Sequence, residues 1–194
     1  MSEVDLARAA QAIEQFLRAV GAPIDDDPEL ADTGRRVAEA FAGDLLAGYH
    51  EDPAAILGES TTSAARGMVL VTAIATSTTC PHHLMPAPGL AHVGYLPGER
   101  VVGLGALARL VDCYARRLIL QEDLGRAIAL AMVEHLGAQA AGVVLDLAPT
   151  CMTARGDRRH GARAITSAYE GPLAAELRAE MSLAIASRGP ELGR

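Results

Sequence analysis

Apolar residues in the first fifth of the chain recur with helical spacing. Between residues 4 and 20 they fall on one helix face, at Leu6, Ala10, Ile13, Leu17 and Val20. The segment GAPIDDDPE ends this pattern, and Thr33 can cap a second helix. Its buried stripe is expected at Val37, Ala40, Phe41 and Leu45. Residues 50–67 contain Gly, Ser, Thr and Pro and are typical of a linker with a short turn.

Strand patterns begin after residue 67. MVLVTAI and LAHVGYL are rich in β-forming residues and predict two strands, over residues 68–74 and 90–96. Helical periodicity follows over residues 104–118 and 122–136, then strands at 142–147 and 163–169 and a closing helix at 173–187. This order predicts an α+β domain with helices on one face of an antiparallel sheet. We therefore expect an N-terminal helical region, residues 1–66, and an α+β domain, residues 67–194.

Composition narrows the chemistry that this chain can perform. Half of its 194 residues are hydrophobic but only 3% are aromatic, so Ala, Leu and Val must fill the core. The 17 basic residues are all arginine, which excludes lysine Schiff-base chemistry and leaves anion binding to guanidinium groups and backbone amides. A net charge of -7 argues against nucleic acid as a partner, because phosphate binding needs a basic face.

The sequence indicates a cytoplasmic protein without a membrane anchor. It has no apolar run of 18 residues, and its N-terminus is acidic and helical, unlike a signal peptide. Three cysteines, an odd number, favour a reducing compartment.

The stretch STTCPHHLMP, residues 77–86, carries the candidate chemistry. In a turn, Cys80 and His83 can approach one Zn²⁺ while His82 points elsewhere, but a C-x-x-H pair needs a third ligand. Cys113 lies on the expected buried side of a helix, whereas Cys151 directly follows a strand. Two cysteines and one histidine form a catalytic zinc site with an open position for water, and His82 could act there as an acid or base. A structural or accidental cluster remains open on these residues alone.

Four motifs resemble the GTP cyclohydrolase I family. STTCPHHLMP, VVGLGALARLVDCYARRLILQEDL, CMTARG and ITSA occur in the family's order and spacing, and the resemblance covers about residues 30–172. It implies a tunnelling fold, assembly as a homodecamer with active sites between subunits, and a small-molecule purine substrate. In this family, zinc activates a water that attacks C8 of guanine and opens the imidazole ring.

The resemblance also implies roles for individual residues. Cys80, His83 and Cys151 match the zinc ligands, and His82 matches the histidine that handles protons on the purine. Gln121 and Glu122 match the pair at the guanine edge. The triphosphate would be held by Arg36, Arg109 and Arg155, whose planar guanidinium groups suit phosphate oxygens.

Several family residues are replaced in this chain. A second catalytic histidine is Pro149, a Ser-Lys pair is Gly105-Ala106, and the Glu of a CEHH motif is Pro81. A lysine three residues after the helix-two arginine is Glu39. Each lost charge-assisted hydrogen bond contributes roughly 1.5–3 kcal/mol. Triphosphate binding is therefore expected to weaken by several orders of magnitude, while the guanine end is intact.

These replacements predict an altered substrate or product. With His82 alone, the first carbon–nitrogen cleavage is expected and loss of formate is not, so a ring-opened formamidopyrimidine is the expected product. His160 could supply the missing group, although an exposed loop histidine is the favoured interpretation. Two alternatives are a catalytically silent paralogue that binds guanine or pterin, and ordinary GTP cyclohydrolase I activity.

Overall fold

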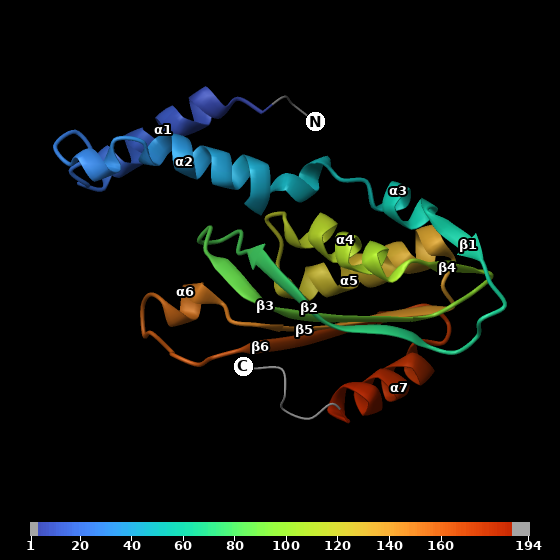
Figure 1. The fold of residues 1–194 in the computed structure, drawn as a ribbon. Coiled ribbons are helices and arrows are strands. Elements are labelled where there is room, and N and C mark those ends of the chain that lie inside the picture. Colours follow the sequence, from blue (N-terminus) through green and yellow to red (C-terminus); the bar gives the residue numbers. More distant parts are fainter. Residues whose placement is uncertain (1–3, 188–194) are drawn as a thin grey trace.

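A four-stranded antiparallel sheet forms the centre of the molecule (Figure 1). The computed structural model describes residues 4–187. The strands lie in the order β2-β3-β5-β6. Their bounds are Val69–Thr79 for β2, Pro86–Leu96 for β3, Ala140–Leu147 for β5 and Ala164–Glu170 for β6. The register of β2 on β3 shifts between Val71 and Ile74, where Ala73 has a φ of 58°. Such a bulge bends and twists the strand.

Two consecutive helices cover one face of the sheet, as the sequence predicts. They are α4 (Leu104–Ala115) and α5 (Gln121–Ala131), and α5 continues into a π-helical turn, η4 (Met132–Leu136). The fully buried side chains of Leu107, Leu110 and Ile128 belong to the same core cluster as Val93 and Leu145 of the sheet. This arrangement confirms the α+β class expected for a tunnelling fold.

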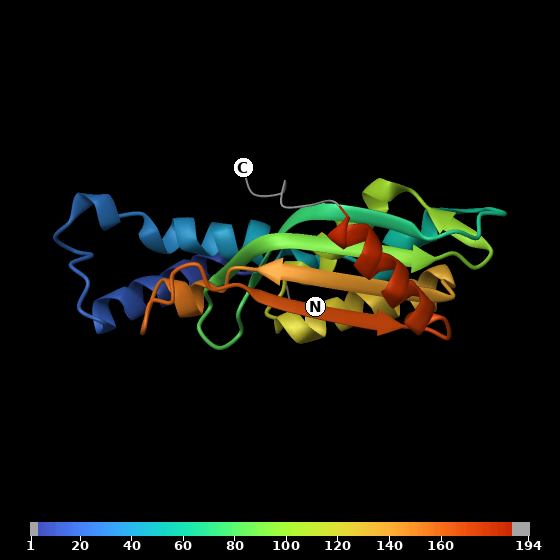
Figure 2. The same ribbon diagram turned by 90° about the horizontal axis from the view of Figure 1, so that it is seen from below.

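The closing helix α7 (Ala174–Ala186) lies on the opposite face of the sheet, an arrangement that the sequence did not predict. Figure 2 shows it crossing the strands. Its Leu177 and Met181 are fully buried there. A Cβ atom at Gly94 or Gly142 would lie only 2.9 Å or 2.8 Å from the Met181 sulfur. Glycine at these two strand positions therefore allows α7 to pack closely on the sheet.

The N-terminal segment forms a helical hairpin that extends beyond the sheet (Figures 1 and 2). Its helices are α1 (Leu6–Ala19) and α2 (Thr33–Ala40), joined through a 3-10 turn, η1 (Pro28–Leu30). A Cβ at Gly34 would lie 2.6 Å from the Ala10 carbonyl oxygen, so the helices touch at this glycine. No α1 residue is buried, and Phe16 and Val20 are each 61% exposed. Apolar side chains of this hairpin and the turns that follow it line a cavity of about 500 Å³.

The turns after α2 are fixed to the end of α4. They are η2 (Phe41–Leu45) and η3 (Ala47–His50). Gly48 donates a backbone hydrogen bond to Arg116 O at 3.0 Å, and Arg117 Nε donates to Gly48 O at 3.0 Å. The Arg117 guanidinium also lies over the Tyr114 ring, 4.8 Å from its centroid. The turns that follow the N-terminal hairpin are thus attached to the end of α4.

The segment expected to be a linker is mostly ordered structure. It contains α3 (Pro53–Gly58) and β1 (Ser60–Thr62), which pairs with β4 (Arg100–Val102) in a separate two-stranded sheet. Asp52 caps α3 by accepting from Ala54 N at 2.9 Å, and Ile56 and Leu57 are buried in the main core. A further short helix, α6 (Thr150–Thr153), follows β5. Within residues 4–187, no helix has the length and apolar character needed to cross a membrane.

Candidate metal centre

A tight turn directly after β2 places Cys80 beside His83. Cys80 O accepts from Leu84 N at 2.9 Å, and Cys80 N donates to Met85 O at 3.0 Å. Leu84 adopts a φ of 53°, which reverses the chain direction toward β3. As a result, Cys80 Sγ and His83 Nδ1 are 4.0 Å apart.

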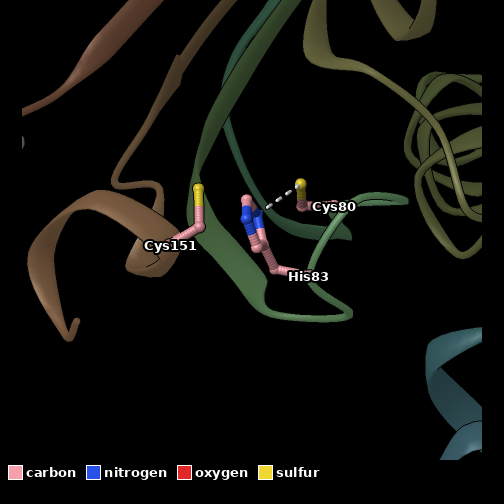
Figure 3. A group of neighbouring side chains, drawn as sticks. All are labelled: Cys80, His83 and Cys151. Carbon is pink, nitrogen blue, oxygen red and sulfur yellow. Dashed lines mark hydrogen bonds between the residues drawn. The ribbon is translucent and has the colours of Figure 1, made fainter. Parts of the chain in front are cut away.

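Cys151 reaches this turn from the other side of β3. It lies in α6, immediately after β5. The Thr150 hydroxyl donates to Pro86 O, and Ala148 N donates to Pro88 O at 2.8 Å, so both sides of Pro149 are tied to the start of β3. Figure 3 shows the His83 ring between the two cysteine sulfurs. One donor atom from each of Cys80, His83 and Cys151 lies within 4.8 Å of the others.

This group has the composition and approximate size of a zinc site. Tetrahedral zinc with bonds of about 2.0–2.3 Å brings its ligand atoms within roughly 3.5–3.8 Å of one another. A contraction of at most about 1.3 Å from the observed spacing would therefore suffice. Burial, followed by the neighbouring Cys80, raises the pKa of the Cys151 thiol. A cation between the two sulfurs would offset that penalty on the thiolate.

Two further side chains predicted to act at the site border the metal group. His82 is exposed, with Nδ1 3.9 Å from Cys80 Sγ. Arg155 lies one turn after Cys151, and its Nη1 is 3.2 Å from His83 Nε2. The arginine expected at the phosphate end therefore lies against a predicted metal ligand.

The predicted guanine-edge residues lie at the same end of the sheet. Leu118 forms a β-bridge with Thr79, the residue before Cys80, and α5 begins three residues later. Gln121 Nε2 donates to Ala164 O at 2.8 Å, which fixes this end of α5 to the start of β6. Glu122 is exposed in the first turn of α5.

The other two predicted phosphate ligands are not brought to the metal group. Arg36 lies on α2, 3.9 Å from Asp32. Arg109 lies on α4, which starts after β4 at the opposite end of the sheet, and it pairs with Glu59. Each of these two arginines therefore pairs with a carboxylate of its own chain, while α2 and the metal turn line one cavity through Val37 and Leu84.

The structure shows what lies around most of the positions that depart from the expected motifs. Pro149 is half-buried directly before α6, and Glu39 pairs with Arg35 at 2.9 Å. Gly105 and Ala106 line a cavity of about 280 Å³ together with Glu59 and Arg109. Sequence reasoning missed Glu59, because it lies in the segment interpreted as a linker.

His160 is exposed, as the favoured interpretation expects. It lines a cavity of about 480 Å³ behind α6, together with Ala148 and Arg163. Arg163 is held there by Asp146, with Nε 2.6 Å from the carboxylate oxygen.

Sequence comparisons with known proteins agree with one another. A family model described as GTP cyclohydrolase I matches residues 9–186. A protein named GTP cyclohydrolase 1 from Corynebacterium glutamicum is 45% identical over 174 residues, covering 87% of this chain and 86% of that protein. Proteins of the same name are 42% identical in Thermobifida fusca, covering 87% and 81%, and 39% identical in Dehalococcoides mccartyi, covering 83% and 87%. Among solved structures, an archaeosine synthase QueF-Like in the apo form shares 18% identity with a TM-score of 0.45, covering 55% of this chain and 96% of that one.

Proposed function

This chain belongs to the GTP cyclohydrolase I family, and from that premise we propose that it is a zinc-dependent hydrolase acting on cyclic amidine C–N bonds. Its substrate is a guanine-type purine nucleotide or nucleoside, attacked at C8 so that the imidazole ring opens. The observation that carries this proposal is the convergence of Cys80, His83 and Cys151 at the end of the sheet where α5 begins.

The proposed roles follow from the chemistry of each side chain. Zinc bound by the two sulfurs and one imidazole supplies a Lewis acid that lowers the pKa of water. His82, exposed beside Cys80, is the proposed proton carrier to and from the purine. The carboxylate of Glu122 accepts hydrogen bonds from the ring N–H and exocyclic amine of guanine, and Gln121 binds beside it.

We further propose that the reaction stops early and favours substrates with fewer phosphates. Expulsion of C8 as formate needs proton transfer to a second nitrogen, and the residue matching the second histidine is Pro149, which cannot titrate. At the phosphate end, Gly105 and Ala106 supply neither hydroxyl nor cation. The proposed product is a ring-opened formamidopyrimidine.

Complete conversion of GTP to 7,8-dihydroneopterin triphosphate is the second candidate. It is favoured by the identity of 45% to a relative named GTP cyclohydrolase 1. Under this candidate, His160 or solvent would replace the missing histidine.

Product analysis separates these candidates. The purified, zinc-loaded protein is incubated with GTP, GMP and guanosine, and the products are identified by mass spectrometry. Addition of one water without loss of formate supports the proposal, while dihydroneopterin triphosphate supports the second candidate. Turnover of none of these purines by a zinc-replete protein would favour a silent, ligand-binding paralogue.

Site variants test the assigned roles. Cys80→Ala and Cys151→Ala are expected to lose bound zinc, measured by elemental analysis, together with activity. His82→Ala is expected to retain zinc and lose at least about a hundredfold in kcat, because general acid–base catalysis contributes about that much or more. Retention of full activity by His82→Ala would contradict its proposed role.

A further inference from the structure

Arg109 is already engaged by a carboxylate on the surface of this chain. Its guanidinium pairs with Glu59, and both side chains are more than half exposed. The pair borders the cavity of about 280 Å³ that Gly105 and Ala106 also line. Any anion that enters this cavity to reach Arg109 must therefore approach Glu59 as well.

The backbone holds Glu59 at this place. It follows α3, whose Ile56 and Leu57 are anchored in the core, and it precedes β1. β1 pairs with β4, with Ser60 opposite Val102, and α4 begins two residues after Val102. Glu59 is thus fixed next to α4 by packing on one side and by strand pairing on the other.

We propose that Glu59 is a specificity-determining residue that disfavours highly phosphorylated substrates at the Arg109 site. This inference rests on the proposed function, with Arg109 beside the substrate phosphates as the family resemblance implies. Glu59 neutralises the guanidinium that a phosphate would bind, and its negative charge repels the phosphate directly. Both effects grow with the charge of the substrate, so guanosine is affected least and GTP most.

A binding experiment tests this without relying on catalysis. The full-length, zinc-loaded protein is titrated calorimetrically with inorganic tripolyphosphate. Glu59→Gln is expected to bind it about tenfold more tightly than the wild type at low ionic strength, with the gain shrinking as salt is added. The matched control is Asp25→Asn, which removes one negative charge from the exposed pair of Asp25 with Arg18 and should leave binding unchanged.

A double substitution identifies the cation involved. In an Arg109→Ala background, the added Glu59→Gln change is expected to lose the part of its effect that comes from neutralising Arg109 and to keep the part that comes from direct repulsion. Equal affinity of Glu59→Gln and wild type for tripolyphosphate, or an equal gain in Asp25→Asn, would overturn the inference.

Kinetics complete the test. Glu59→Gln is expected to raise the ratio of kcat/KM for GTP to that for guanosine by about tenfold. If no purine is hydrolysed but Glu59→Gln binds tripolyphosphate more tightly, the proposed function fails while the role of Glu59 stands. If purines are hydrolysed but the ratio is unchanged, the role of Glu59 fails alone.

Discussion

The three cysteines of this chain have different surroundings. Cys113 is 1% exposed within α4, and burial raises the pKa of its thiol despite the contact of Arg117 Nη2 with its sulfur at 3.2 Å. Cys80 and Cys151 are half-buried on the turn and short helix of the metal group. A thiol reacts only when it is accessible to the reagent and deprotonated. The three cysteines should therefore differ in their rates of alkylation.

Alkylation of the native protein is expected to follow this difference. Without zinc, iodoacetamide at pH 8 should modify Cys80 and Cys151 at least about tenfold faster than Cys113. Added zinc should slow the alkylation of Cys80 and Cys151 and leave the rate at Cys113 unchanged, as measured by peptide mass spectrometry. Equal protection of all three thiols would indicate a global effect on stability and would count against the metal group.

Individual site residues were predictable to different degrees. Cys80 and His83 could be paired from their spacing, and Cys151 from its position after a strand, and the structure brings the three together. Their roles, like those of His82, Gln121 and Glu122, stay predictions. Glu59 could not be identified, because its position beside Arg109 depends on the pairing of β1 with β4, about 40 residues away.

Helices and strands with strong periodicity were predicted close to their observed bounds. The strand expected over residues 68–74 runs on to Thr79, through polar positions that periodicity does not mark as a strand. Pairing with β3 supplies the hydrogen bonds that keep this part extended. The strands β1 and β4 were missed because they are defined by pairing with each other, which a local pattern does not contain. The helix α3 carries a local signal, Asp52 before Pro53, that was interpreted only as a short turn.

Contact between η3 and α4 makes Gly48 sensitive to substitution. A Cβ at this residue would lie 2.4 Å from Cys113 O and 2.9 Å from Arg116 O, which are backbone atoms that cannot rotate away. Gly48→Ala should therefore lower the free energy of unfolding by about 1–3 kcal/mol, as measured by urea denaturation.

Gly43 provides the matched control for this substitution. It lies five residues earlier, and a Cβ there meets nothing within 4 Å. Gly43→Ala should be neutral or slightly stabilising, because alanine is favoured over glycine in a helical turn. A similar loss of stability in both variants would mean that the close approach of Gly48 to α4 is not the cause.

The residues proposed to form the site lie in different parts of the molecule. The metal group lies at one end of the sheet, while Arg109 lies on a helix that starts at the other end and Arg36 lies on the N-terminal hairpin. We infer from this division that a neighbouring copy completes the site. An oligomer with sites between subunits is the arrangement that the family resemblance implies.

Subunit mixing tests this arrangement. Cys80→Ala and Arg109→Ala, each weakly active on a phosphorylated substrate by itself, are co-expressed with different tags and the mixed oligomer is purified. If one subunit supplies the metal group and another supplies Arg109, about a quarter of the sites contain both intact parts and activity returns to about that level. Activity no greater than the mean of the two single variants would place both residues in the same subunit.

The attachment of η3 to α4 also bears on how copies could be arranged around an axis. If the orientation of the N-terminal hairpin varied freely, one copy could meet the next at many angles, giving rings of mixed size or open filaments. Here Gly48 and Arg117 hold η3 against the end of α4. If the hairpin contacts the next copy, this small joint would help to set the angular step from copy to copy, and with it the number of members at which a ring closes.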